Sequence, residues 1–190
     1  MKTPQDILNQ FKEDSIKYVD LRFTDPKGKW QHLTIDIAMI DEEFLEEGTM
    51  FDGSSIAGWK AINESDMVLK PDLDTGFIDP FFAQTTLVFF CDILEPYTGE
   101  DYTRDPRSTA RRAEAYVKSS GVGDTVFFGP EAEFFVFDDV RWSVEQHKIG
   151  FEFDSDEGPY NSDAEYEAGN MGHRPRTKGG YFPVSPVDSG

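Results

Sequence analysis

FDGSSIAGWKAINESDMVL occupies residues 51–69 and carries more information than any other stretch of the chain. It opens with a small polar turn at Asp52–Ser55, because glycine supplies unusual backbone angles while aspartate and serine bond their own backbone. An aromatic anchor, Trp59, and a second acidic cluster, Glu64 and Asp66, follow it. The turn alone predicts only a change of chain direction, but it can also carry a carboxylate into a neighbouring site.

Working outward from this stretch, local patterns predict helices and strands on both sides. Thr3 as N-cap, Pro4 at the first position and Asp6 three residues after the cap indicate a helix start with a capping box. The remaining predicted elements are strands over 18–23 and 30–37, a short helix over 41–47 and a buried strand over 86–94. Together they predict a small α+β domain.

The second half of the chain begins with a helix from Asp105–Pro106 to about Ser120, ended by Gly121. The strongest strand pattern follows over residues 125–140. Beyond Phe151 the composition becomes acidic and rich in Gly, Asn and Pro, which predicts a long loop.

Two glutamates, Glu131 and Glu133, lie two residues apart in that predicted strand. Because side chains alternate along a strand, both face one side, with Cα atoms about 6.6 Å apart. Phe135 and Phe137 continue the same face, so the carboxylates need cations or partners to offset desolvation. Carboxylate oxygens suit Mg²⁺ or Mn²⁺. The pattern favours a metal-binding pair over a half-solvated strand.

Composition narrows the class of function. The net charge of −19 argues against nucleic acid or an anionic membrane as partner, since both require clustered Lys and Arg. Cys91, the one cysteine, lies in an apolar run, which indicates a buried thiol and a reducing compartment. The start of the chain lacks a signal-peptide core, and no segment approaches the roughly 20 apolar residues that span a bilayer. We therefore expect a cytoplasmic protein.

Three motifs together resemble one enzyme family. They are the stretch at 51–69, GPEAEFFVF at 129–137 and KGGYFP at 178–183. In this order, and over essentially the whole chain, they resemble the N-terminal part of bacterial type I glutamine synthetases. Ser185 stands where many bacterial members carry proline, a departure that affects no catalytic residue.

The resemblance implies an α+β fold in two parts. Residues 1–103 would form a small β-grasp-like domain with a leading helix, and residues 104–190 would begin the large α+β catalytic domain. In the family, further metal ligands, the nucleotide-binding stretch and the phosphate-binding arginines lie further downstream. We therefore expect that residues 1–190 alone do not catalyse the reaction of this family.

The activity implied is ATP-dependent amidation of glutamate through a γ-glutamyl phosphate, with two divalent cations, Mg²⁺ or Mn²⁺, per site. By resemblance, Glu131 holds the cation that bridges the ATP phosphates, and Glu133 the one nearer the substrate carboxylate. Asp52 would bind ammonium and take its proton, and Ser54 and Tyr181 would line the same pocket. In the family this loop enters the adjacent subunit's site, so the expected assembly is a homo-dodecamer of two hexameric rings, acting on glutamate, ammonium and ATP.

Two alternatives stay open. A related ligase that joins glutamate to a polyamine or another amine would share the glutamate pair, but the ammonium-pocket residues Asp52, Ser54 and Tyr181 favour ammonia. A non-catalytic acidic module would bind cations loosely and would lose no binding when Glu131 or Glu133 is changed singly.

Overall fold

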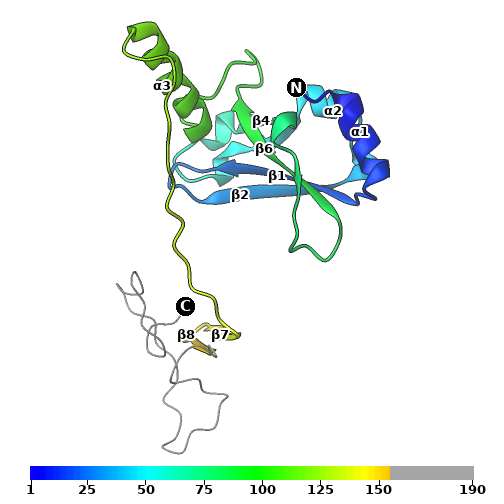
Figure 1. Cartoon of the computed structure of the whole chain (residues 1–190), viewed down its shortest axis with the longest axis vertical. Coiled ribbons are helices and arrows are strands. Elements are labelled where there is room, and N and C mark those ends of the chain that lie inside the picture. The colour runs from blue at the N-terminus through cyan, green and yellow to red at the C-terminus, as the bar shows by residue number, and fades with distance from the viewer. Residues whose placement is uncertain (155–190) are drawn as a thin grey trace, which may run out of the picture. The chain divides into compact units, whose positions relative to one another are not determined.

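The computed structural model describes residues 1–154, and the chain forms two units, Met1–Phe127 and Phe128–Gly190 (Figure 1). The first unit contains α1 (Pro4–Glu13), β1 (Tyr18–Thr24), β2 (Trp30–Asp36), α2 (Glu42–Glu47), β3 (Thr49–Asp52), β4 (Asp66–Pro71), β5 (Phe77–Ile78), β6 (Thr86–Leu94) and α3 (Pro106–Ser120). In the second unit the described elements are β7 (Asp139–Glu145) and β8 (Lys148–Asp154).

The strands of the first unit form one sheet in the order β2-β1-β6-β4-β3, with β5 also paired to β6. Strands β1 and β6 run parallel, and every other pair is antiparallel. Strand β6, the last in sequence, therefore lies between the two hairpins that precede it. This mixed sheet with its helices confirms the expected α+β, β-grasp-like fold.

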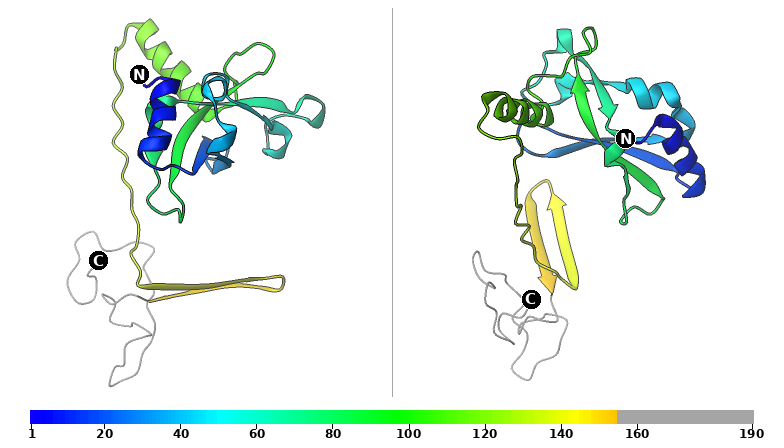
Figure 2. Two further views of the ribbon diagram at one scale, coloured as in Figure 1. Left: turned by 90° about the vertical axis from the view of Figure 1, so that its right-hand side faces the viewer. Right: turned by 45° about the horizontal axis from the view of Figure 1, so that its top comes forward.

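The local signals at the helix ends are confirmed. Thr3 caps α1, and its hydroxyl accepts from the Asp6 backbone while the Asp6 carboxylate accepts from the Thr3 backbone. Asp41 caps α2, which ends at Gly48. The two helices lie side by side (Figures 1 and 2). The ends of both helices are therefore set by residues adjacent in sequence.

The core lies between α1, α2 and the sheet. Helix α1 buries Ile7 and Phe11, and α2 buries Leu45. The sheet supplies the alternate residues of its central strands, which include Val19, Leu21, Phe23, Met67, Leu69, Leu87, Phe89, Cys91 and Ile93. As expected, Cys91 is buried, and burial raises the pKa of its thiol, which favours an inert structural side chain.

The opposite face of β1 carries a buried charged network. Asp20 is fully buried and accepts from Arg22 Nε at 2.8 Å and from the Thr34 hydroxyl at 2.7 Å, with His32 Nδ1 at 2.7 Å. Arg22 also pairs with Asp79 at 2.6 Å. Three partners on the Asp20 carboxylate offset the cost of burying its charge.

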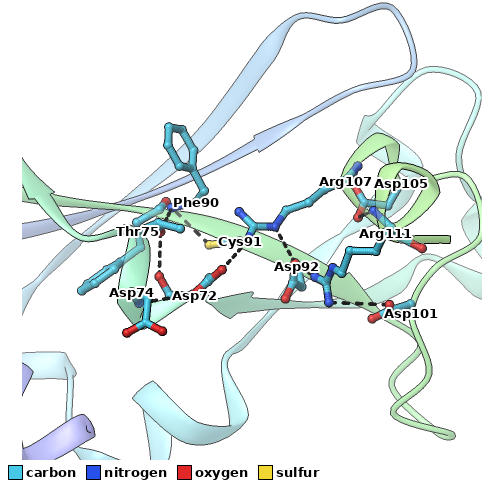
Figure 3. Close-up of polar contacts among 12 residues, drawn as sticks. Asp72, Asp74, Thr75, Phe90, Cys91, Asp92, Asp101, Asp105, Arg107 and Arg111 are labelled. Atoms are coloured by element: carbon cyan, nitrogen blue, oxygen red, sulfur yellow. Dashed lines mark hydrogen bonds and ion pairs between the residues drawn. The ribbon is translucent and has the colours of Figure 1, made fainter. Parts of the chain in front are cut away.

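Helix α3 meets the sheet through ion pairs more than through apolar packing, because Ser108 is its one fully buried residue. Figure 3 shows Arg107 and Arg111 reaching from α3 to carboxylates near β6. Arg107 pairs with Asp72 and, at 2.9 Å, with Asp92, which also pairs with Arg111. These contacts hold α3 against the sheet within the first unit.

The predicted strand over residues 125–140 is wrong for residues 125–138. This segment forms no strand, and regular pairing begins only at Asp139, in the hairpin β7–β8 (Figure 2). A strand is defined by its interstrand hydrogen bonds, and no strand ladder within residues 1–154 includes this segment. Residues 151–154 belong to β8 rather than to a loop, and the rest of the predicted loop lies outside the described residues.

Within residues 1–154, no helix is both long enough and apolar enough to cross a membrane.

Candidate functional site

The polar turn at the start of the 51–69 stretch follows directly from β3. Asp52 ends that strand and caps a single 3₁₀ turn at Gly53–Ser55. One Asp52 oxygen accepts from the Ser54 backbone at 2.8 Å and from the Ser54 hydroxyl at 2.6 Å. The other lies 3.4 Å from the Ser55 hydroxyl. The structure thus brings together the two predicted residues Asp52 and Ser54.

These donors set the charge state of the carboxylate. The Ser54 hydroxyl and then the Ser54 backbone N–H lower the pKa of Asp52 below its ordinary value. Because the side chain is also exposed, the site presents an ionised carboxylate to solvent near neutral pH. An ionised carboxylate with its lone pairs oriented by serine attracts a cation.

A second carboxylate faces the same side. Asp66 lies directly opposite Asp52 in the antiparallel register of β3 and β4, and both are exposed. Side chains opposite one another in such a pair share one face of the sheet. The turn therefore carries a local excess of negative charge at the end of the hairpin.

Gly53 is required by close approach rather than by a left-handed backbone. A Cβ at this position would lie 2.3 Å from the sulfur of Met67, a fully buried core residue. The Gly53 backbone also donates to the Ser65 carbonyl at 2.7 Å. The turn is thus pressed against β4, which fixes the residue next to Asp52.

Trp59 anchors the far end of the same loop, as its place in the sequence predicts. It is 6% exposed and stacks on Phe23 at 5.6 Å between ring centroids, while Tyr102 at 5.5 Å and Phe51 at 6.1 Å contact it edge-on. Its indole N–H is buried and finds no acceptor within residues 1–154. Packing alone holds this side chain.

Sequence reasoning did not find the contacts made by the residue after Trp59. Lys60 pairs with both oxygens of Glu95, at 2.7 and 2.8 Å. The partners are separated by 35 residues in sequence, and a single sequence carries no signal that couples them.

Glu131 and Glu133 lie in the segment that forms no strand, and both are exposed. The alternation argument that placed them on one face of a strand therefore does not apply to this chain. Phe135, expected on the same covered face, is 60% exposed. Since these glutamates and Asp52 belong to different units, their separation is not defined. Tyr181 lies outside the described residues.

The glutamate pair has the right chemistry for a hard cation but does not complete a site. Divalent Mg²⁺ and Mn²⁺ are held by several oxygen ligands, and two exposed carboxylates supply only part of such a set. Within residues 1–154, no group of three or more His, Cys, Asp or Glu side chains converges on a common point. A metal at Glu131 and Glu133 would need further ligands.

Two family models match the chain in succession. The model described as glutamine synthetase, beta-Grasp domain, matches residues 15–96, and the model described as glutamine synthetase, catalytic domain, matches residues 103–190. The two family models divide before α3, whereas the compact units of the structure divide after it, between Phe127 and Phe128.

Curated relatives agree with these models. A glutamine synthetase from Bradyrhizobium diazoefficiens is 69% identical over 189 residues, which cover 100% of this chain and 40% of the relative. One from Escherichia coli K12 is 60% identical over 183 residues, covering 96% of this chain and 39% of the relative. The chain thus spans about 40% of the length of these relatives.

A solved structure shows the same fold. The cryo-EM structure of Plasmodium falciparum glutamine synthetase aligns with a TM-score of 0.67 and 22% identity, covering 100% of this chain and 37% of that one.

Proposed function

Because the chain belongs to the glutamine synthetase family, we propose that it forms the N-terminal part of a ligase that makes glutamine from glutamate and ammonia with ATP. A carboxylate is a poor acyl donor, so ATP first converts the glutamate side chain to a γ-glutamyl phosphate. Ammonia then displaces phosphate. We place the boundary between the β-grasp and catalytic parts at residues 103 and 104.

The observation that carries the proposal is the exposed Asp52 carboxylate, held by Ser54 on a loop that is fixed at both ends. Its lowered pKa makes it a weak base toward free ammonium, so its first role is to bind the cation. Asp66, on the same face, adds to the attraction. The proton moves from the bound ammonium to Asp52 only as the nitrogen attacks the γ-glutamyl phosphate. Ser54 orients the carboxylate, and Tyr181 would line the pocket.

Glu131 and Glu133 would hold divalent cations, Mg²⁺ or Mn²⁺, together with ligands from outside the described residues. Two such cations neutralise the charge of the transferred phosphoryl group when bound. The active form would be a homo-oligomer, a dodecamer of two hexameric rings, in which the Asp52 loop serves a neighbouring subunit, and the cytoplasm would be its compartment. Residues 1–190 alone would be inactive, since they supply only part of each site.

The test is glutamine formation by the full-length protein, with ATP and Mg²⁺, for wild type and Asp52→Ala. Losing a charged partner of ammonium should raise the KM for ammonium or lower turnover by about 10²-fold or more. Asp36→Ala is the matched control, because Asp36 also caps a 3₁₀ turn and accepts from a backbone N–H two residues on, at 2.9 Å.

Equal activity of wild type and Asp52→Ala would remove the proposed role of the loop. Activity with amines in place of ammonia would point to the amine ligase. A wild-type protein with no ligase activity would leave a cation-binding module, and single changes at Glu131 and Glu133 would then decide how cations bind.

A further inference from the structure

The loop that carries Asp52 is tied at its far end to the segment that leads out of the β-grasp unit. Lys60, directly after the buried Trp59, forms a two-oxygen ion pair with Glu95. The side chains are 17% and 32% exposed, so water screens the pair only in part. The Lys60 ammonium also lies 5.2 Å above the ring of Tyr102, which adds a cation–π contact.

A second contact joins the same two segments. Arg104 donates to the Gly58 carbonyl at 2.8 Å, one residue before Trp59. Tyr102 packs edge-on against Trp59. Four contacts between residues 58–60 and residues 95–104 therefore converge within one turn of the loop.

The segment at the other side of these contacts is itself fixed. Glu95 directly follows β6, and its backbone donates to the Glu100 carbonyl at 2.9 Å. The Tyr102 backbone donates to Ile93 of β6 at 2.8 Å, and Asp105 caps α3. Residues 95–105, here called the connector, thus form a rigid corner between β6 and α3.

We propose that Lys60 and Glu95 are positioning residues that set the placement of Asp52 and Ser54 by tying their loop to the connector. This inference rests on the proposed function, in which those two residues bind ammonium. The near end of the loop is fixed by β3–β4 pairing and by the close approach of Gly53 to Met67. The far end depends on Trp59 and on the ion pair.

Loosening the far end of the loop should affect the binding of one substrate more than that of the others. A loosened far end lets the carboxylate and its serine donors shift relative to the ammonium pocket. In the proposed enzyme, Glu131 and Glu133 would hold the cations near the ATP phosphates and the substrate carboxylate, and neither residue belongs to this loop. Breaking the tie should therefore weaken ammonium binding more than glutamate or ATP binding.

The test uses charge reversal in the full-length protein. Lys60→Glu and Glu95→Lys each place like charges at contact distance, and each should raise the KM for ammonium about fivefold or more. The KM values for glutamate and ATP should change less than twofold. The double variant Lys60→Glu/Glu95→Lys restores an opposite pair and should return the KM for ammonium to within about twofold of wild type.

Amide hydrogen exchange supplies a readout that does not depend on activity. In each single variant the peptide covering residues 51–60 should exchange about fivefold faster, and in the double variant at the wild-type rate. Lys27→Glu, the same charge change at an exposed turn residue, is the control and should alter neither measurement. Arg104→Ala, which removes only the bond to Gly58, gives a milder variant should the reversals fail to fold.

The outcomes separate the two ideas. An inactive wild type refutes the proposed function, and exchange still tests the tie. An active wild type whose single variants keep both the exchange rate of residues 51–60 and the KM for ammonium overturns the inference. So does equal loss in the single and double variants, which would mean that Lys60 and Glu95 act independently. A fall in stability with all three KM values unchanged would leave the ion pair a purely structural contact and contradict a positioning role.

Discussion

At the scale of single residues, Trp59 is held by ring packing while its N–H has no acceptor among the described residues. An unsatisfied buried donor costs free energy, so replacing the indole by a ring without that donor offsets part of the lost packing. We expect Trp59→Phe to lower the free energy of unfolding by less than about 2 kcal/mol, and Trp59→Ala by about 3–5 kcal/mol. Urea unfolding followed by far-UV circular dichroism measures both. Similar losses for the two variants would show that the indole N–H is bonded in solution.

Asp20 gives a pH-dependent prediction. Burial raises the pKa of this carboxyl, but hydrogen bonds from His32, Thr34 and Arg22 outweigh it, so the folded pKa lies below the ordinary value. A lowered folded pKa contributes stability that is present above the unfolded pKa and lost as pH falls through the folded pKa. At pH 7 we expect Asp20→Asn to cost about 3 kcal/mol, because Arg22 loses a buried partner.

That cost should be present above about pH 4, the ordinary pKa of an aspartic acid. It should shrink as the pH falls below this value and through the lowered folded pKa of Asp20, where the wild-type carboxylate becomes protonated. Unfolding free energies of both proteins across this range provide the measurement. Asp36→Asn, at an exposed carboxylate on the neighbouring β2, serves as control and should change stability little. A gap between wild type and Asp20→Asn that stays constant with pH would mean that Asp20 is not ionised in the folded state.

At the scale of elements, α3 depends on its N-cap. Asp105 is buried, and its oxygens accept from the Ser108 backbone at 2.9 Å and the Arg107 backbone at 3.3 Å. Burial raises the pKa of Asp105 against the opposing effect of those bonds, so its charge is unfavourable while its acceptor atoms are favourable. Asp105→Asn should leave stability within about 0.5 kcal/mol at pH 7, and Asp105→Ala should cost about 1–2 kcal/mol. Urea unfolding compares them, and an equal cost for both would show that the cap needs the charge.

Sequence predicted the elements whose causes are local and missed those whose causes are distant. The capping box at Thr3, the Asp105 cap and the stop at Gly121 depend on neighbours within four residues, so a single sequence contains them. The Lys60–Glu95 pair and the pairing of β1 with β6 join segments far apart in the chain. In the candidate site, the polar turn at Asp52–Ser55 is local, and its prediction is confirmed.

Residues 125–138 show the same limit of prediction from a single sequence, here for a segment whose local pattern is strong but which forms no strand. Their alternation and aromatic content are typical of a strand, but a strand also requires a partner with free backbone groups. The sequence pattern thus predicts that the segment forms a strand when such a partner is present. The position of Glu131 and Glu133 depends on that partner as well, which is why the metal pair stays a prediction.

At the scale of the whole molecule, the segment over residues 125–138, which joins no strand ladder within residues 1–154, predicts where a protease cuts. Phe127, Phe128 and Phe134 are 80–90% exposed in backbone that forms no helix or strand. Among residues 1–154, chymotrypsin should cleave there first and leave a resistant fragment of about residues 1–127. Mass spectrometry of a time course identifies the cuts.

The exposed aromatic residues Phe81 and Tyr97 are the internal control. Both lie in short loops closed by backbone hydrogen bonds, Asp79 to Thr86 at 3.1 Å and Gly99 to Glu95 at 2.9 Å, so they should be cut more slowly despite similar exposure. In the full-length protein, strands of the proposed catalytic domain would pair with residues 125–138, and cleavage there should slow about tenfold or more. Equal rates in the two proteins would mean that this segment gains no partner. Glu131 and Glu133 would then lack the fixed strand that a shared metal site requires.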